Sequence, residues 1–218
     1  RWPDGSLLVE GLDLSLRAGE ISALLGPSGC GKSSLLRLAA GLLEGSGRIE
    51  APEAKAFVFQ QPTLLPWRSV RDNVALPLEL GAPAGASVEE ALASVDLSEA
   101  ADLLPGQLSG GMQMRTSLAR ALVTRPELML LDEPFAALDA LTRRRLQRRF
   151  EELQREQGFT TLLVTHDIDE AVLLADRVLV LSGPPVQVQL DLDVHVERPR
   201  RAHDPALAEL VARLEGAL

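Results

Sequence analysis

The nonapeptide Gly26–Ser34, GPSGCGKSS, is the feature that most constrains the fold of this 218-residue chain. It lies between a short apolar run, Ile21–Gly26, and an apolar run with helical periodicity that begins after Lys32. Its glycines let the backbone approach a ligand closely, because glycine has no Cβ. Strand, glycine-rich turn, Lys-Ser pair and helix, in this order, match the pattern of a phosphate loop. The sequence therefore predicts a site for the phosphates of a nucleotide.

Each residue type in the loop has a part in that prediction. Backbone amides and the N-terminal end of the following helix attract anions. Lys32 is expected to reach the β- and γ-phosphates, and the Ser33 hydroxyl is expected to bind Mg²⁺. The predicted nucleotide-binding residues of the loop are Gly26, Pro27, Ser28, Gly29, Cys30, Gly31, Lys32, Ser33 and Ser34. A glycine turn without a ligand is the alternative, and the complete pattern in its strand–helix context argues against it.

Further apolar runs indicate an α/β fold. They are Ala56–Gln60, Leu128–Pro134, Thr160–Asp167 and Arg177–Gly183. Continuous apolar strands separated by helical patterns suggest a mostly parallel sheet covered on both faces. Residues 7–16 alternate loosely, and we expect an N-terminal antiparallel β portion there. In the last segment, one helical face carries Leu207, Leu210, Val211, Leu214 and Leu218.

The segment from about residue 64 to residue 121 shows no strong strand, and residues 87–97 and 109–124 read as helices. We therefore expect a single domain over residues 1–218. Its core comprises about residues 1–63 and 122–218, and a helical subdomain at about residues 64–121 is inserted into it.

Composition excludes several classes of function. A single cysteine, Cys30, rules out a disulfide framework and favours a reducing compartment. No apolar stretch approaches the roughly 18 residues of a membrane span, and no signal peptide is evident, so we expect a cytoplasmic protein. The formal net charge of -9 argues against bulk affinity for nucleic acid or anionic lipid. The chain begins at Arg1, so we expect residues to precede it.

The run LMLLDEP ends in two carboxylates, Asp132 and Glu133. At the carboxyl end of a buried parallel strand, they are expected to lie beside the phosphate loop. Asp132 can hold Mg²⁺ through water, and Glu133 can polarise a water that attacks the γ-phosphate. A strand that ends in a solvated acidic turn is the alternative.

The stretch LSGGMQ, Leu108–Gln113, resembles the signature of the ATP-binding cassette (ABC) ATPases, with Met112 where that family usually has glutamine. The resemblance covers nearly the whole chain, and its motifs follow the family's order. It implies that ATP joins two protomers head to tail, with one protomer's signature contacting ATP on the other. The signature residues are Leu108, Ser109, Gly110, Gly111 and Met112. A serine that caps a helix before two glycines is the alternative for this stretch alone.

The same resemblance implies roles for four further residues. Trp2 lies where the family stacks an aromatic ring on adenine. Gln60 matches the glutamine that senses Mg²⁺ and links the core to the helical lobe, with Gln61 as the competing choice. Asp139, in FAALDA, matches the polar residue of the loop after the acidic pair. His166, in VTHD, matches the histidine that contacts the γ-phosphate and the catalytic water.

Three features have structural alternatives that we favour. RRRLQRRF, residues 143–150, suggests a nucleic-acid patch, but acidic residues follow it and Arg148–Glu152 has i,i+4 spacing, so a solvated helix face is expected. Cys30 has no histidine near it in sequence and is not expected to be catalytic. Trp67 is expected to pack where the helical lobe meets a membrane partner.

The leading function is therefore an ABC importer's ATPase subunit that uses ATP and Mg²⁺. The phrases QPTLLPWRSVRDNV, LSGGMQMRTSLARAL and EPFAALDALTR resemble the nitrate/sulfonate/taurine importer group. The resemblance implies permease subunits docked near the helical subdomain, a homodimer on ATP binding, an indirectly coupled solute-binding protein and no nucleic acid. It also implies a peripheral location on the inner face of the membrane.

Two other classes remain as alternatives. A soluble ABC protein acting on DNA or ribosomes would be expected to have long coiled coils or two cassettes, and neither is present. A phosphate-loop kinase for a small metabolite would explain Gly26–Ser33 but would leave LSGGMQ and His166 without a purpose.

Overall fold

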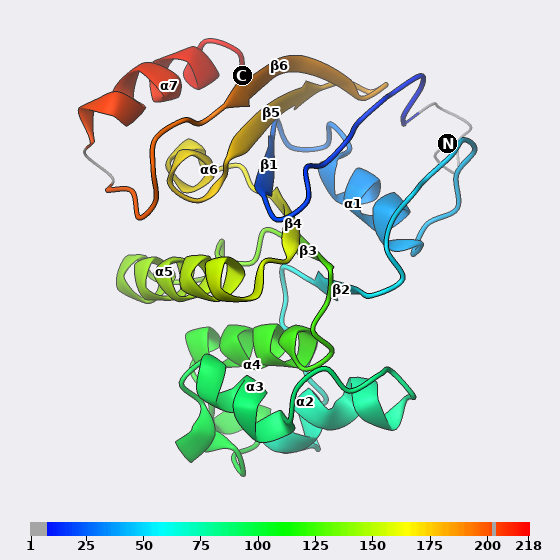
Figure 1. The fold of residues 1–218 in the computed structure, drawn as a ribbon, viewed down its shortest axis with the longest axis vertical. Coiled ribbons are helices and arrows are strands. Elements are labelled where there is room, and N and C mark those ends of the chain that lie inside the picture. The colour runs from blue at the N-terminus through cyan, green and yellow to red at the C-terminus, as the bar shows by residue number, and fades with distance from the viewer. Residues whose placement is uncertain (1–7, 202–203) are drawn as a thin grey trace. The chain divides into compact units, whose positions relative to one another are not determined.

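The computed structural model describes residues 8–201 and 204–218. The chain forms two compact units. The first contains the residues up to Ala51 together with those from Thr160 onward, and the second contains Pro52–Phe159. Figure 1 shows the helices and strands of both units, coloured along the chain.

Within the described residues of the first unit, four strands form a sheet. They are β1 (Ile21–Leu25), β4 (Thr160–Val164), β5 (Arg177–Ser182) and β6 (Gln187–Asp193). Their order is β4-β1-β5-β6, with β4, β1 and β5 parallel and β6 antiparallel to β5. All of β1 and most of β4 and β5 are buried, which explains why these strands read as continuous apolar runs.

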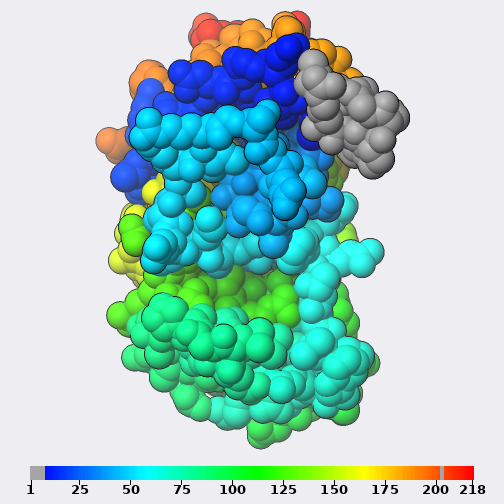
Figure 2. Space-filling view, turned by 90° about the vertical axis from the view of Figure 1, so that its right-hand side faces the viewer, coloured from blue at the N-terminus to red at the C-terminus, as the bar shows by residue number. Residues whose placement is uncertain are grey.

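Three helices accompany this sheet in the described part of the first unit: α1 (Lys32–Ala40), α6 (Ile168–Leu174) and α7 (Pro205–Glu215). Helix α1 packs against β4, α6 packs against β1, and α7 packs against α6 (Figure 1). Residues 41–50 follow α1, are all exposed, and lie on the face that Figure 2 shows.

The second unit contains a parallel pair of strands and four α-helices. The strands are β2 (Lys55–Val58) and β3 (Leu128–Asp132), and the helices are α2 (Val70–Glu79), α3 (Val88–Ser94), α4 (Gly110–Leu122) and α5 (Ala140–Gln157). Two short 3-10 turns, Ser98–Ala100 and Pro105–Gln107, precede α4. Residues 64–121 contain no strand.

The core of the second unit is built on aromatic contacts as well as aliphatic packing. Phe150 on α5 lies edge-on to Phe135, with ring centroids 6.2 Å apart, and its ring centroid is 5.9 Å from that of Phe159. All three rings are buried. Pairs in this geometry add about 0.5–1.5 kcal/mol each beyond their buried area. Phe135, which precedes α5, and Phe159, which follows it, therefore both pack against Phe150 on the helix.

The α/β fold with a mostly parallel sheet is confirmed, but one of its expected parts is not found. Residues 8–16 form no strand and make a single bridge, Val9 with Val186, which is parallel. The antiparallel pairing is instead that of β5 with β6. The alternation of apolar and polar residues in 8–16 did not predict a strand correctly, because a strand also requires a partner strand along its length.

Several elements were missed or ended differently from expectation. Strand β6 and helices α2 and α6 were not predicted from the sequence. Helix α1 ends at Ala40, where Gly41 adopts a left-handed conformation, so Leu42 lies beyond the helix and is 58% exposed. Helix α7 buries Leu207 and Leu214 as expected but ends before Leu218. In the described residues, no helix combines the length and apolar character needed to cross a bilayer.

Candidate functional site

The phosphate loop follows β1 in the first unit, and its glycines are required by geometry at two positions. Gly26 has φ 151°, and a Cβ there would lie 2.4 Å from the Leu181 carbonyl oxygen. Gly31 has φ 112°, and a Cβ there would lie 2.6 Å from a methyl carbon of Val186. L-residues with a side chain rarely adopt such φ values. The backbone can therefore take this path only with glycine at both positions.

Lys32 begins α1 and points back into the loop. Its Nζ donates to the carbonyl oxygens of Gly26 (2.6 Å) and Pro27 (3.0 Å) and lies 3.9 Å from the Cys30 Sγ. Lys32 is only 6% exposed and Cys30 only 1% exposed. The N-cap of α1 is Gly31, which has no side chain to accept from the helix's first amides. The loop thus encloses one ammonium group and presents helix amides, a donor set that fits a polyphosphate.

His166 lies at the same edge of the first unit's sheet as the phosphate loop. Strands β1 and β4 are parallel with Leu24 opposite Val164, so extending this register by two residues brings His166 level with Gly26. His166 is exposed, whereas Thr165 before it is buried. The next residue, Asp167, caps α6 by accepting from the Glu170 amide at 3.1 Å. The register therefore brings two of the predicted motifs, far apart in the sequence, to the same edge of this sheet.

In the second unit, the same geometry brings Gln60 to Glu133. Strands β2 and β3 are parallel with Val58 opposite Leu131, and both predicted residues lie two positions further along. The Gln60 Nε2 lies 3.5 Å from the Glu133 Oε2. Asp132 is the last residue of β3 and is 6% exposed, whereas Glu133 is half-buried and has φ 46°.

That left-handed backbone at a glutamate costs energy, of order 1–3 kcal/mol, and such outliers cluster at functional sites. It turns the chain sharply where the strand ends. Strand β2 ends at Val58 rather than at Gln60, so the glutamine stands on the loop.

The signature residues lie at the N-terminus of α4. Ser109 is the N-cap, and its Oγ accepts from the Met112 amide at 3.3 Å. Ser109 and Gly110 are exposed, whereas Leu108 is buried below them. Ser109 therefore caps α4, as the alternative interpretation of this stretch predicts. A capped, exposed helix N-terminus is also a suitable surface for an anion.

Gly111 on α4 lies against the first turn of α5, the helix that Asp139 caps. A Cβ on Gly111 would lie 2.3 Å from the Thr142 Cγ2, whereas a Cβ on Gly110 would meet nothing within 4 Å. Asp139 caps α5 by accepting from the amides of Leu141 (3.1 Å) and Thr142 (3.0 Å). The glycine at 111 is thus required by close helix packing, and the structure brings the signature together with the start of α5.

The hydrogen bonds that Asp139 accepts as the N-cap of α5 favour its ionised form. Hydrogen bonds from the side chain and amide of Thr142 lower the pKa of Asp139 below its usual range. A carboxylate with a lowered pKa in the folded state contributes stability above its unfolded pKa, and this contribution is lost as pH falls through the folded value. The cap therefore stays ionised at neutral pH.

Three other predictions can be placed, and a fourth, Trp2, lies outside the described residues. Cys30 is a free, buried thiol. In α5, Glu152 forms an ion pair with Arg149 at 3.1 Å and not with Arg148, the predicted partner. Further arginines of this helix are exposed, as expected for a solvated face. Trp67 is 73% exposed.

Sequence reasoning missed two polar residues that hold the loop after Gln60. Asn73, fully buried at the start of α2, accepts from the Leu65 amide and donates to three carbonyls, those of Leu65, Arg68 and Ser69. Arg120, near the end of α4, donates to Pro62 and Thr63. A polar residue within an apolar helical run, such as the arginine in LARALV, is the signal that could have found the second of them.

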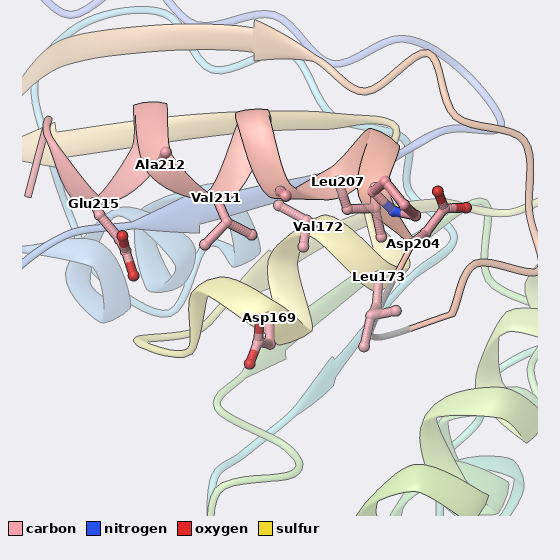
Figure 3. Close-up of a pocket in the computed structure, with 10 residues that line it drawn as sticks. Asp169, Val172, Leu173, Asp204, Leu207, Val211, Ala212 and Glu215 are labelled. Atoms are coloured by element: carbon pink, nitrogen blue, oxygen red, sulfur yellow. The ribbon is translucent and has the colours of Figure 1, made fainter.

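A shallow groove between α6 and α7 contains none of the predicted site residues (Figure 3). Val172, Leu173 and Val211 supply apolar lining, and carboxylates stand at Asp169 and Glu215. Carboxylates beside apolar side chains would repel a polyphosphate. The groove therefore has no part in the candidate site.

Candidate ligands for Mg²⁺ among the described residues are individual oxygen donors. No group of three or more His, Cys, Asp or Glu side chains in this part of the chain is arranged to hold a metal ion. Mg²⁺ in nucleotide sites is typically held by one or two protein oxygens together with phosphates and water. Ser33 on α1 and Asp132 on β3 are oxygen donors of the kind that Mg²⁺ prefers.

Comparison with known proteins points to one family. Residues 9–136 match the family model described as "ABC transporter". An aliphatic sulfonates import ATP-binding protein of Streptomyces avermitilis is 50% identical over 212 residues, which cover 97% of this chain and 80% of that protein. A protein with the same description from Pseudomonas fluorescens is also 50% identical, over 96% of this chain and 80% of that protein.

Solved structures give the same result. A dimeric post-hydrolysis state of the ATP-binding cassette MJ0796, bound to ADP and Pi, aligns with a TM-score of 0.74 and 29% identity. The alignment covers 87% of this chain and 92% of that one. The cassette cbiO1 of Clostridium perfringens, part of the transporter complex cbiONQ, aligns with a TM-score of 0.79 and 26% identity, over 99% of this chain and 88% of that one.

Proposed function

Because this chain belongs to the ABC transporter family, whose cassettes bind and hydrolyse ATP, we propose that the importer it energises takes up aliphatic sulfonates. The chain is the ATPase subunit of an ABC importer. The narrower proposal, on the solute, rests on the single observation that relatives about half identical along nearly all of this chain are described as aliphatic sulfonate importers.

We propose the following division of labour for ATP hydrolysis. The phosphate loop and the N-terminus of α1 bind the phosphates, and Lys32 neutralises part of their charge. Ser33, Asp132 and Gln60 hold Mg²⁺, which when bound neutralises charge that develops on the transferred phosphoryl group. Glu133 orients and deprotonates the attacking water, and His166 contacts the γ-phosphate.

Two features of the described geometry support these roles. The parallel register of β1 and β4 sets His166 beside the phosphate loop, and that of β2 and β3 sets Gln60 beside Glu133. Fixed positions at strand ends reduce the reorganisation needed when charge develops. Trp2 is proposed to stack on adenine.

We further propose how the chain assembles. ATP joins two copies head to tail, with Ser109, Gly110 and Gly111 of one copy contacting the nucleotide of the other and Asp139 beside that contact. Residues 64–121, which are helical and carry the exposed Trp67, form the subdomain that docks on membrane-spanning permease subunits. The core over about 1–63 and 122–218 carries the nucleotide. The chain acts in the cytoplasm on the inner face of the membrane, and a solute-binding protein delivers solute to the permease.

The solute is tested by uptake in the native organism with a chromosomal Lys32→Ala substitution. We expect uptake of labelled ethanesulfonate to be lost, because its transport requires this ATPase, while uptake of labelled nitrate continues. Uptake of labelled taurine, a sulfonate with an amino group, shows whether the importer also carries amino-substituted sulfonates. Loss of nitrate uptake with normal ethanesulfonate uptake would contradict the proposed solute but leave the ATPase assignment intact.

Lys32→Ala should weaken ATP binding by the purified chain by at least about tenfold. The lysine carries the only ammonium group buried in the described part of the loop, and a charge-assisted bond to phosphate is worth about 1.5–3 kcal/mol. Calorimetric titration with ATP measures the affinity, and thermal unfolding reports whether loss of the bonds to Gly26 and Pro27 disturbs the loop. Lys55→Ala, at an exposed position that begins β2, is the matched control. Unchanged affinity in Lys32→Ala would refute the role of this lysine.

A further inference from the structure

Arg120 on α4 holds the loop that carries Gln60. Its Nη2 donates to the Pro62 carbonyl oxygen at 2.9 Å and to the Thr63 Oγ1 at 3.2 Å, and its Nη1 donates to the Thr63 carbonyl oxygen at 3.0 Å. A longer contact of 3.4 Å joins Nη2 to the Ser117 Oγ on its own helix. One planar guanidinium group thus binds two consecutive residues of the loop at once.

The environment of Arg120 makes these bonds strong. Arg120 is partly buried, and burial lowers the pKa of its guanidinium below its usual range. Removing a guanidinium from water costs free energy unless the protein supplies hydrogen-bond acceptors for it. Hydrogen bonds from a charged donor are about twice as strong as those between neutral groups. The carbonyls of Pro62 and Thr63 are those acceptors.

The loop itself has little else to fix it at this point. Within the described residues, the main chain of residues 61–64 makes no hydrogen bond to another main-chain group. Pro62 has no amide hydrogen to donate. Thr63 has φ 46°, a left-handed conformation that is unfavourable for a β-branched residue. This backbone persists only because its surroundings hold it.

The next part of the loop is held from a second helix, by Asn73. Residues 65–69 are therefore held by α2 and residues 62–63 by α4, so Gln60 lies in the short span between the end of β2 at Val58 and the contacts of Arg120. The Gln60 amide lies 3.5 Å from the Glu133 carboxylate, at the edge of hydrogen-bond distance. A small displacement of residues 62–63 would thus change whether these two groups meet.

We infer that Arg120 is a positioning residue for ATP hydrolysis: by binding Pro62 and Thr63 it sets the place of the Gln60 amide relative to Glu133. The inference rests on the proposed role of Gln60 in holding Mg²⁺. Arg120 acts through its contacts with the loop and takes no direct part in the reaction.

Arg120→Lys tests this, since a lysine keeps the charge but lacks the planar fork that spans two carbonyls. We expect kcat for ATP hydrolysis to fall about tenfold, as displacements of about 1 Å in a site cost up to ~10²-fold. The KM for ATP should stay within about twofold, because the phosphate loop is unchanged. The Mg²⁺ concentration for half-maximal activity should rise. Thr63→Val, which removes one acceptor and keeps the shape, should lower kcat by about two- to threefold and so tests the same contact if Arg120→Lys does not fold.

A double substitution separates positioning from general destabilisation. If Arg120 acts through Gln60, then Arg120→Lys added to Gln60→Ala should lower kcat no further. Arg149→Lys is the matched control, because Arg149 also donates to a carbonyl between helices of this unit, that of Ser94 at 2.6 Å, and lies on α5 rather than at the glutamine loop. It should leave kcat and the Mg²⁺ requirement unchanged.

The outcomes distinguish the two proposals. A full additional loss of activity in the double variant, or an unchanged kcat in either Arg120→Lys or Thr63→Val, would overturn the inference while leaving Gln60 its role. A wild-type kcat and Mg²⁺ requirement in Gln60→Ala alone would overturn both the role of Gln60 and the inference built on it.

Discussion

Glu133→Gln should abolish ATP hydrolysis while leaving ATP binding intact. Glutamine has almost the shape of glutamate, so the turn at φ 46° and the neighbouring Gln60 are retained. An amide cannot take the proton of the attacking water, and loss of a general base lowers a rate by about 10²-fold or more. Phosphate release measures turnover, and calorimetric titration with ATP measures binding.

Because ATP would then persist, Glu133→Gln should also accumulate as a dimer in the presence of ATP. Gel filtration with ATP should show a stable dimer, and with ADP a monomer. Glu127→Gln is the matched control, since Glu127 is an exposed glutamate just before the other end of β3. Hydrolysis at the wild-type rate in Glu133→Gln would exclude this residue as the base.

Ser109→Arg should leave ATP binding to the monomer nearly unchanged and abolish both dimerisation and hydrolysis. Ser109 is exposed at the N-terminus of α4, and the adjacent Gly110 has open space around it. An arginine there would fill the surface proposed to receive the partner's nucleotide. Loss of the N-cap alone costs only about 1 kcal/mol, so the chain should still fold. Equilibrium sedimentation with ATP and phosphate release are the measurements.

Mixing variants makes the test of Ser109 sharper. In a heterodimer of Ser109→Arg with Lys32→Ala, both defects fall on one composite site and the other has an intact phosphate loop and an intact signature. Some ATPase activity should return if one site can act alone. Ser98→Arg, at an exposed serine of a 3-10 turn in the same unit, controls for the added charge. Normal turnover by Ser109→Arg alone would count against a head-to-tail dimer and favour the kinase alternative.

Local sequence predicted the elements whose residues are buried on every side. The runs at 21–25, 128–132, 160–164 and 177–182 could be assigned because strands inside a covered parallel sheet are apolar along most of their length. The glycines at 26 and 31 could be assigned because no other residue takes their backbone angles without clash. The likeness to solved ATP-binding cassettes confirms the fold class that these patterns indicate.

Elements at edges and ends were less predictable, since their residues face water on one side. Strand β6 alternates Val188, Leu190 and Leu192 with polar residues, and only its pairing with β5 distinguishes it from a polar loop. Residues 8–16 also alternate loosely and yet form only one bridge, between Val9 and Val186. A half-buried strand is specified by its partner as much as by its own residues.

The sequence by itself determined the family of this protein and predicted the chemistry proposed for it, from a phosphate-loop pattern, an acidic pair, a signature serine and a histidine. Only the tertiary structure decided which side chains meet. The register of parallel strands, a property of two segments together, sets Gln60 beside Glu133 and His166 beside Gly26. Likewise, the role of Arg120 depends on two carbonyls 57 and 58 residues away along the chain. Hydrogen bonds to main-chain carbonyls leave no pattern in the sequence of the accepting residues, because every residue has a carbonyl to offer.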